Sequence, residues 1–184
     1  MALTATLRRF HIALADSDRG IYTDLDLRAA QHPSESDRYL VARVLARCLE
    51  DAEGLDFTRG LSADDEPALW QRDLRGDLQA WIEVGTPSVE RLHKASKTGA
   101  RVVVYGWQRS STLARDLADR AVHRGDEIAL FSLDPTFLDR VAETLDKRNR
   151  WDLAVSGATL YLTIAGTVHE CGIQRVPIEG ASSS

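Results

Sequence analysis

The sequence predicts a protein of the α/β class, with a mixed central sheet flanked by helices and additional β hairpins at the N- and C-terminal ends. Helical and strand-like segments alternate between residues 87 and 132, which favours at least one pair of parallel strands. Both ends of the chain carry strand-like patterns instead. A length of 184 residues, with 43% hydrophobic and 28% charged residues, is typical of one globular domain, which we expect over residues 1–184.

The N-terminal segment predicts an antiparallel hairpin. Residues 3–14 alternate in hydropathy, and the phase of the alternation changes at Arg8-Arg9, which indicates a β-bulge. A turn-rich segment over residues 16–20 leads into a second alternating run over residues 21–27.

The clearest helix of the chain is expected after His32-Pro33. Ser34 is a suitable N-cap, and Glu35 and Asp37 place negative charge at the positive end of the helix dipole. Apolar residues follow at helical spacing, and Gly54 ends the helix. These apolar residues are Leu40, Val41, Val44, Leu45, Cys48, Leu49 and Ala52.

Short strands and helices alternate in the middle of the chain. Strands are expected over residues 55–61, 68–73 and 78–84. A helix then begins at Thr86-Pro87, since proline favours the first helical position, and the apolar run Val102-Val103-Val104 predicts a buried strand.

The last third of the chain returns to strand patterns after two more helices. A helix capped near Ser110 extends to His123, and Asp134-Pro135 begins the next one after a short strand. The remaining strands are expected over residues 151–155, 158–164 and 167–176.

The overall charge and the cysteines narrow the class of function. Acidic residues outnumber basic ones by 28 to 23, which argues against a general phosphate-binding surface but not against an acidic metal-binding cleft. Cys48 and Cys171 show no zinc-type spacing and are expected to be buried thiols. No signal-peptide core and no apolar run of about 20 residues occurs, so we expect a soluble cytoplasmic protein without a membrane partner.

Four side chains are candidates for chemistry. Glu35 opens the first helix, Asp65 lies in an acidic loop before Pro67, Glu83 lies within an apolar strand, and Lys94 lies on the helix that follows. A carboxylate among apolar neighbours costs free energy unless a cation or hydrogen-bond donors satisfy it. Two or three carboxylates suffice to hold Mg²⁺, and a nearby lysine can stabilise the charge that develops when water attacks a phosphodiester.

Several segments of this sequence resemble the bacterial YaeQ family. They are Met1-Ala2-Leu3-Thr4-Ala5-Thr6, His32-Pro33-Ser34-Glu35, Phe57-Thr58-Arg59-Gly60-Leu61, Ala63-Asp64-Asp65-Glu66-Pro67, Trp81-Ile82-Glu83-Val84-Gly85 and the helix with Arg91 and Lys94-Ala95. The resemblance extends over nearly the whole chain and is most specific between residues 32 and 97. It implies a variant of the PD-(D/E)XK nuclease fold, with a restriction-endonuclease-like core over about residues 32–132.

The resemblance also implies roles for the four candidates. Glu35 would be the acid on the first core helix, Asp65 the acid before the second core strand, and Glu83 the acid of the strand motif. All three would bind Mg²⁺ or Mn²⁺. The superfamily pattern places a lysine two residues after the strand acid, where this chain has Gly85, so Lys94 becomes the candidate replacement.

Each candidate also has a structural interpretation. Glu35 can serve the helix N-terminus, and Asp65 can belong to a solvated Asx-turn. Glu83 can form an ion pair with a basic residue, and Lys94 can lie on an exposed helix face. The basic residues that could pair with Glu83 are Arg59, Arg91 and Lys94.

Three functional hypotheses follow from these alternatives. The first is a Mg²⁺- or Mn²⁺-dependent nuclease-like phosphodiesterase in which Glu35, Asp65, Glu83 and Lys94 are catalytic. The second is an inactive nuclease-like module that contacts nucleic acid or a protein of the transcription machinery, which Gly85 and the acidic net charge favour. The third is a structural network in which the acids and bases neutralise one another. The sequence leaves the oligomeric state open.

Overall fold

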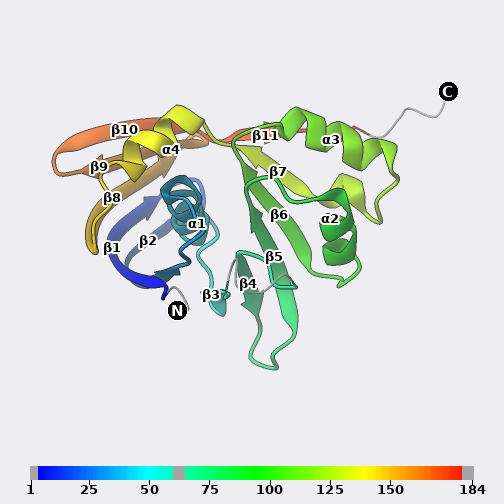
Figure 1. Cartoon of the computed structure of the whole chain (residues 1–184), viewed down its shortest axis with the longest axis horizontal. Coiled ribbons are helices and arrows are strands. Elements are labelled where there is room, and N and C mark those ends of the chain that lie inside the picture. The colour runs from blue at the N-terminus through cyan, green and yellow to red at the C-terminus, as the bar shows by residue number, and fades with distance from the viewer. Residues whose placement is uncertain (1–3, 60–64, 180–184) are drawn as a thin grey trace. The chain divides into compact units, whose positions relative to one another are not determined.

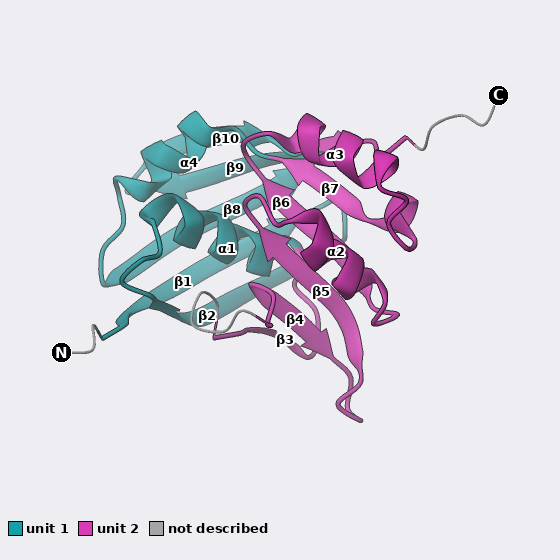
Figure 2. Cartoon of the chain, turned by 45° about the vertical axis from the view of Figure 1, so that its right-hand side comes forward, with its two compact units in different colours: residues 1–49, 133–173 teal, residues 50–132, 174–184 magenta. Residues whose placement is uncertain are grey.

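The computed structural model describes residues 4–59 and 65–179. The chain forms two compact units (Figure 2). Unit 1 comprises residues 1–49 and 133–173, and unit 2 comprises residues 50–132 and 174–184. Each unit is assembled from two separate stretches of the sequence.

The sheet of unit 1 has five strands in the order β10-β9-β8-β1-β2 (Figure 1). The strands β1 (Thr6–Asp16) and β2 (Ile21–Gln31) form the predicted antiparallel hairpin, and β8 (Arg148–Ser156) lies parallel to β1. The strands β9 (Thr159–Ile164) and β10 (Thr167–Gly172) complete the sheet as antiparallel neighbours.

The bulge predicted at Arg8-Arg9 is wrong. The pairing of β1 with β2 is continuous from Thr6, opposite Gln31, to Asp16, opposite Ile21. Leu7, the apolar residue just before the phase change, therefore lies on the face opposite Phe10 and is half exposed.

Two helices cover one face of this sheet, α1 (Asp37–Leu49) and α4 (Pro135–Ala142) (Figure 2). The strand residues that point toward them are buried, and the residues between them in the sequence point to the open face and are mostly polar. Phe10 meets Trp151 edge to face, with ring centroids 5.0 Å apart. The other buried residues of β1 and β8 include Ile12, Leu14, Leu153 and Val155.

The first helix begins later than the sequence pattern indicates. The Ser36 hydroxyl accepts a hydrogen bond from the Tyr39 amide at 3.1 Å, so Ser36 caps α1 in place of the predicted Ser34. The Ser34 hydroxyl instead contacts Nδ1 of His32 at 2.6 Å. The cap predicted for α4 is confirmed, because the Asp134 carboxylate accepts from the Thr136 amide at 2.9 Å.

The sheet of unit 2 has six strands in the order β11-β7-β6-β5-β4-β3. The strands β3 (Leu55–Phe57), β4 (Leu69–Arg72) and β5 (Leu78–Val84) are antiparallel neighbours. The strands β5, β6 (Arg101–Gly106) and β7 (Ala129–Ser132) are parallel, as predicted for this part of the chain. The short β11 (Gln174–Val176) pairs antiparallel with β7.

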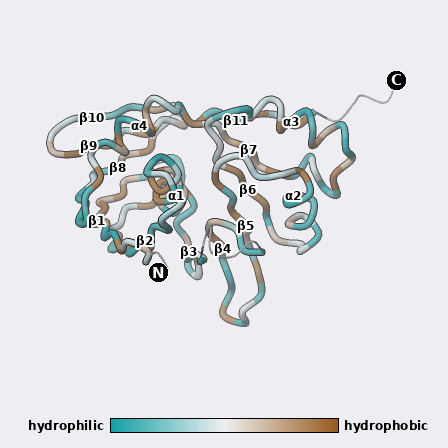
Figure 3. The backbone as a smooth tube through the Cα atoms, viewed as in Figure 1, coloured by the Kyte–Doolittle hydropathy of each residue, from teal (hydrophilic) through white to brown (hydrophobic). Residues whose placement is uncertain are grey.

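The parallel strands of unit 2 are joined by helices. The helix α2 (Val89–Ser96) joins β5 to β6, and α3 (Ser110–Asp119) and the short helix η2 (Gly125–Glu127) join β6 to β7. Their apolar residues pack on β5, β6 and β7, and Figure 3 shows brown segments along β5 and β6. This core includes Trp81, Val89, Leu92, Ala95, Val102, Val104, Leu113, Ala114, Leu117 and Leu130.

The α/β class and the mixed pairing of strands are therefore confirmed, but the strands form two sheets rather than one central sheet. One domain over residues 1–184 stays a prediction. Among the described residues, every helix is too short or too polar to cross a bilayer.

Gly54 provides a test of how β3 and β4 are held together. Its φ of +80° lies in the left-handed region, and a Cβ atom there would lie 1.9 Å from the carbonyl oxygen of Arg72. We expect Gly54→Ala to lower the free energy of unfolding by about 3 kcal/mol or more, measured by urea denaturation.

Gly76→Ala is the matched control. Gly76 has a φ of +89°, and a Cβ atom there would meet open space, so only the backbone strain of about 1 kcal/mol is expected. Equal losses in the two variants would contradict a steric role for the close approach of Gly54 to Arg72.

Candidate functional site

Glu83 is the most deeply buried acid among the described residues of unit 2, with 3% of its surface exposed. The Trp81 indole donates a hydrogen bond from Nε1 to Oε1 of Glu83 at 2.8 Å, because residues two apart on a strand share one face. Nε of Arg91 donates to the same oxygen at 2.5 Å. The Glu83 carboxyl thus receives one donor from its own strand and one from α2.

The position of Arg91 follows from the local structure of α2. Ser88 caps the helix by accepting a hydrogen bond from the Arg91 amide at 3.1 Å, which places Arg91 in the first turn. Arg91 also donates to the backbone carbonyl of Glu66. Glu66 in turn accepts from Arg59, with Nη2 and Oε1 2.7 Å apart, and Arg59 lowers the pKa of the Glu66 carboxyl. A connected polar network therefore runs from Arg59 to Trp81.

Burial is the largest influence on the pKa of the Glu83 carboxyl group. Removal from water raises the pKa of its carboxyl, while the charge of Arg91 and the hydrogen bonds from Trp81 and Arg91 lower it in part. A buried acid with a raised pKa beside a cation is a feature of many functional sites and also of structural ion pairs.

Glu35 is buried in unit 1 and forms a two-pronged ion pair with Arg43 of α1. Nε of Arg43 lies 3.0 Å from Oε1, and Nη2 lies 3.1 Å from Oε2. Only 3% of the Glu35 side chain and 2% of the Arg43 side chain are exposed. Oε2 also accepts from the His32 amide at 3.2 Å, and Arg43 donates to the carbonyl oxygen of Ala30 at 2.9 Å. The pair joins the end of β2 to α1.

The environment of Glu35 resembles that of Glu83. Burial raises the pKa of the Glu35 carboxyl, and the Arg43 charge and the His32 amide lower it in part. The resemblance placed Glu35 on the first core helix, but the residue lies just before α1, which begins at Asp37.

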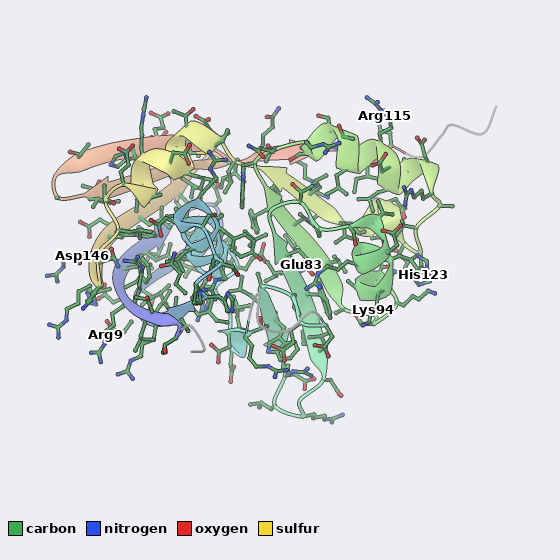
Figure 4. The ribbon with its side chains drawn as sticks, viewed as in Figure 1. Arg9, Glu83, Lys94, Arg115, His123 and Asp146 are labelled. Carbon is green, nitrogen blue, oxygen red and sulfur yellow. The ribbon has the colours of Figure 1, made fainter. Side chains whose placement is uncertain are left out.

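Asp65 and Lys94 are both exposed. Asp65 lies in a turn of unit 2. The pKa of the Arg59 guanidinium is raised mainly by its hydrogen bond to Glu66, and the charge of Asp65 adds to this. Lys94 lies on α2, as Figure 4 shows together with Glu83 on β5, but Arg91 is the residue of this helix that bonds Glu83. Asp64, the less favoured choice for the loop acid, lies outside the described residues.

A metal ion would have to compete with arginine for both buried acids, Glu35 and Glu83. Within neither unit do the described residues bring together three or more His, Cys, Asp or Glu side chains that could hold a metal ion. A hard cation at Glu35 or Glu83 would have to displace or share a bound guanidinium group. As arranged, these two carboxyl groups do not fit a metal site. The ligand set Glu35, Asp65 and Glu83 stays a prediction.

The backbone conformation at the end of β5 explains why a glycine stands at position 85. Gly85 adopts a φ of +89°, in the left-handed region that side chains disfavour, and its amide donates to the Tyr105 carbonyl at 2.9 Å. A lysine at this position would strain the backbone where β5 ends.

The sequence contains signals for both arginine partners of the buried acids, although only one of the two was among the predicted alternatives. Arg91 was one of three alternatives for the partner of Glu83. Arg43 was not anticipated, although it falls on the apolar stripe of α1 between Leu40 and Val44, where a charged side chain signals a buried partner.

The fold and these contacts define a mixed α/β protein in which one buried glutamate of each unit, Glu35 or Glu83, is bound by arginine. A family model described as "YaeQ protein" matches residues 1–173. The chain therefore belongs to the YaeQ family.

Relatives and solved structures agree with this assignment. The chain is 35% identical over 149 residues to "Uncharacterized protein YaeQ" of Escherichia coli (strain K12), covering 76% of this chain and 82% of that protein. The Salmonella typhi protein of the same name is 30% identical over 174 residues, with coverage of 90% and 92%.

Two crystal structures share the fold over nearly their whole length. The YaeQ protein from Xanthomonas axonopodis pv. citri has a TM-score of 0.85 and 33% identity, covering 96% of this chain and all of that one. The YaeQ protein from Pseudomonas syringae has a TM-score of 0.83 and 28% identity, covering 95% and 97%.

Breaking the buried pair of unit 1 is expected to be costly. Arg43→Met leaves the Glu35 carboxyl buried without its cation, so we expect a loss of about 3 kcal/mol or more in the free energy of unfolding. The double variant Glu35→Leu/Arg43→Met removes both charges and is expected to lose less than Arg43→Met alone.

The exposed pair of Arg38 and Asp139, also in unit 1, serves as the control. Its members are bonded at 2.6 Å but lie at the surface, and Arg38→Met is expected to leave stability nearly unchanged. An Arg43→Met variant as stable as Arg38→Met would refute the importance of the buried pair.

The raised pKa of Glu83 predicts the pH dependence of stability. A folded-state pKa above the ordinary value of 4.5 means that the folded protein binds this proton more tightly than the unfolded chain. The resulting stabilisation is complete below that value and is lost as pH rises through the raised pKa.

We expect the stability of the wild type, relative to Glu83→Gln, to fall as pH rises from about 4.5 toward neutrality. Urea denaturation of both proteins over this range measures the difference, and Glu35 titrates equally in both. A relative stability that rises with pH would mean that Arg91 outweighs burial.

Proposed function

We propose that this protein is a nuclease-like binding module that contacts nucleic acid without hydrolysing it. The observation that supports this proposal most directly is the state of Glu83. The strand acid that a nuclease-like core would offer to a metal ion is bound by Arg91 and Trp81 instead.

The order of elements supports a nuclease-like core within residues 32–132. The chain follows α1 with the antiparallel strands β3, β4 and β5, then α2 and the parallel strand β6. In this proposal Glu83 occupies the place of the strand acid, near the end of β5. The lysine expected after it is absent at a backbone position that favours glycine, Gly85.

The chemistry of Arg91 favours binding over hydrolysis. A guanidinium group supplies positive charge beside the Glu83 carboxyl, as a metal ion would. It does not, however, coordinate water and lower its pKa, which is the means by which a metal ion generates a nucleophile at neutral pH. The arrangement retains a charged polar network without a means of activating water.

One observation favours the nuclease itself as a second candidate. Glu83 combines burial, a raised pKa and a neighbouring cation, a combination that is enriched in active sites. The sequence predicts Glu35, Asp65 and Glu83 as the ligands of Mg²⁺ or Mn²⁺ in that reaction. Glu35 and Glu83 would first have to release their arginine partners. Lys94 would stabilise the charge that develops on the phosphodiester.

Binding and cleavage can be separated in one experiment. Fluorescein-labelled single-stranded DNA, single-stranded RNA and duplex DNA are titrated with protein in EDTA, Mg²⁺ or Mn²⁺, and each sample is then run on a denaturing gel. We expect binding in EDTA and no metal-dependent products, from the wild type or from Glu83→Gln.

The alternative outcomes are decisive. Metal-dependent cleavage by the wild type that Glu83→Gln lowers by about 100-fold or more would identify a nuclease and overturn the proposal. Failure of the folded wild type to bind any of the three nucleic acids would also overturn it, and would favour a structural network or a protein partner.

A further inference from the structure

Three arginines form a row across neighbouring strands on the open face of the unit 1 sheet. Arg9 on β1 lies directly opposite Arg28 on β2 and directly opposite Arg148 on β8. All three side chains are exposed. These residues, named the arginine row below, are far apart in the sequence and meet only through strand pairing. Arg150, two residues beyond Arg148, is exposed on the same face opposite His11.

The guanidinium groups of the arginine row have no hydrogen-bond or ion-pair partner within the described part of the chain. Several other arginines of unit 1 are engaged by the protein itself. Arg8 bonds Gln31 at 2.6 Å, while Arg38 and Arg43 are bound by carboxylates. Outside the open face, Arg140 on α4 is also exposed without a partner among the described residues, but the open face is where strand pairing sets several such arginines side by side.

This arrangement opposes folding. Like charges directly opposite each other on neighbouring strands destabilise a sheet. Neighbouring strands lie about 4.8 Å apart, so adjacent members of the row are closer than the Debye length of about 8 Å and are not fully screened by physiological salt. In a chain of net charge −5, three adjacent unneutralised arginines point to an anion from outside the protein.

The row borders a hollow of about 430 Å³. His11 and Asp26 also line it, and Nδ1 of His11 lies 2.8 Å from the Asp26 carboxylate. Figure 4 shows Arg9 among nitrogen-tipped side chains that project away from the ribbon. Further along the same face, Asp24 and Asp152 flank Ala13 on the neighbouring strands, so the basic surface is confined to one end of the sheet.

We propose that the arginine row binds the phosphate backbone of nucleic acid. Guanidinium groups bind phosphate oxygens with paired hydrogen bonds, and such contacts position a strand without reading its sequence. The confined row predicts a short contact of about three phosphates. That the bound polyanion is nucleic acid rests on the proposed function. The new element is that the phosphate contacts lie on unit 1.

The test compares two triple variants of the full chain. Arg9→Gln/Arg28→Gln/Arg148→Gln removes the row, and Arg75→Gln/Arg115→Gln/Arg140→Gln removes the same charge from exposed arginines elsewhere. Binding of labelled single-stranded and duplex DNA is measured by anisotropy between about 50 and 200 mM salt.

Loss of the row is expected to weaken binding at least about tenfold and to reduce the slope of log K against log salt by about 2 to 3. The control variant is expected to change both much less. Because like-charge repulsion is removed, the melting temperature of the row variant is expected to stay the same or rise, which distinguishes lost contacts from lost folding.

Four other outcomes would contradict binding of nucleic acid by the arginine row. Equal losses in both variants would indicate general electrostatics and refute the row. Unchanged binding by the row variant would refute this inference while leaving the proposed function intact, whereas no binding by the wild type would refute the proposed function first. Row-dependent binding of polyglutamate but not of DNA would assign the row to an acidic protein instead.

Discussion

The buried carboxyl group is the constraint on which both units depend. Glu35 and Glu83 lie among apolar side chains, where an acid must be met by a cation or by hydrogen-bond donors. The chain solves this problem in the same way twice: each acid is followed, eight residues later, by an arginine on the helix that comes next. Arg43 and Arg91 thereby fix α1 and α2 against the segments that precede them, within their own units. Removing one partner of such a pair is costly, whereas replacing both partners by apolar residues is often neutral.

The same constraint distinguishes the surroundings of Glu83 from the metal site that the sequence resemblance implies. A carboxyl group bound by arginine is a neutralised part of the structure, and Gly85 turns the backbone just where a lysine would be expected. Among the arginines without a partner in the described part of the chain, the arginine row lies elsewhere, on the open face of the unit 1 sheet. Arg43 and Arg91 thus neutralise acids of the protein itself, whereas the arginine row is free to meet the outside anion proposed above.

Local patterns predicted most of the elements but not their partners. The alternation in β1 and β2, the apolar stripe of α1 and the Asp134 cap depend on residues close in sequence, and they could be predicted. The separate five-stranded sheet of unit 1 could not be predicted. Its strands β1 and β8 pair across about 140 residues, and no local signal encodes that register. The arginine row depends on the same pairing and was missed. The position of Glu83 was predicted, whereas the choice of Arg91 over Lys94 required the cap at Ser88.

The parallel pairing of β1 with β8 has a consequence for the order of events during synthesis. The hairpin of β1 and β2 leaves the ribosome early and α1 follows it directly, but the β1 edge of the hairpin then still lacks its neighbour β8. Its neighbour β8 and the helix α4 emerge only after the long insertion that forms most of unit 2. Contacts between such distant segments form slowly, and unpaired strand edges are prone to aggregate in the meantime. The nascent chain therefore has a long interval in which chaperones have reason to engage its first hairpin.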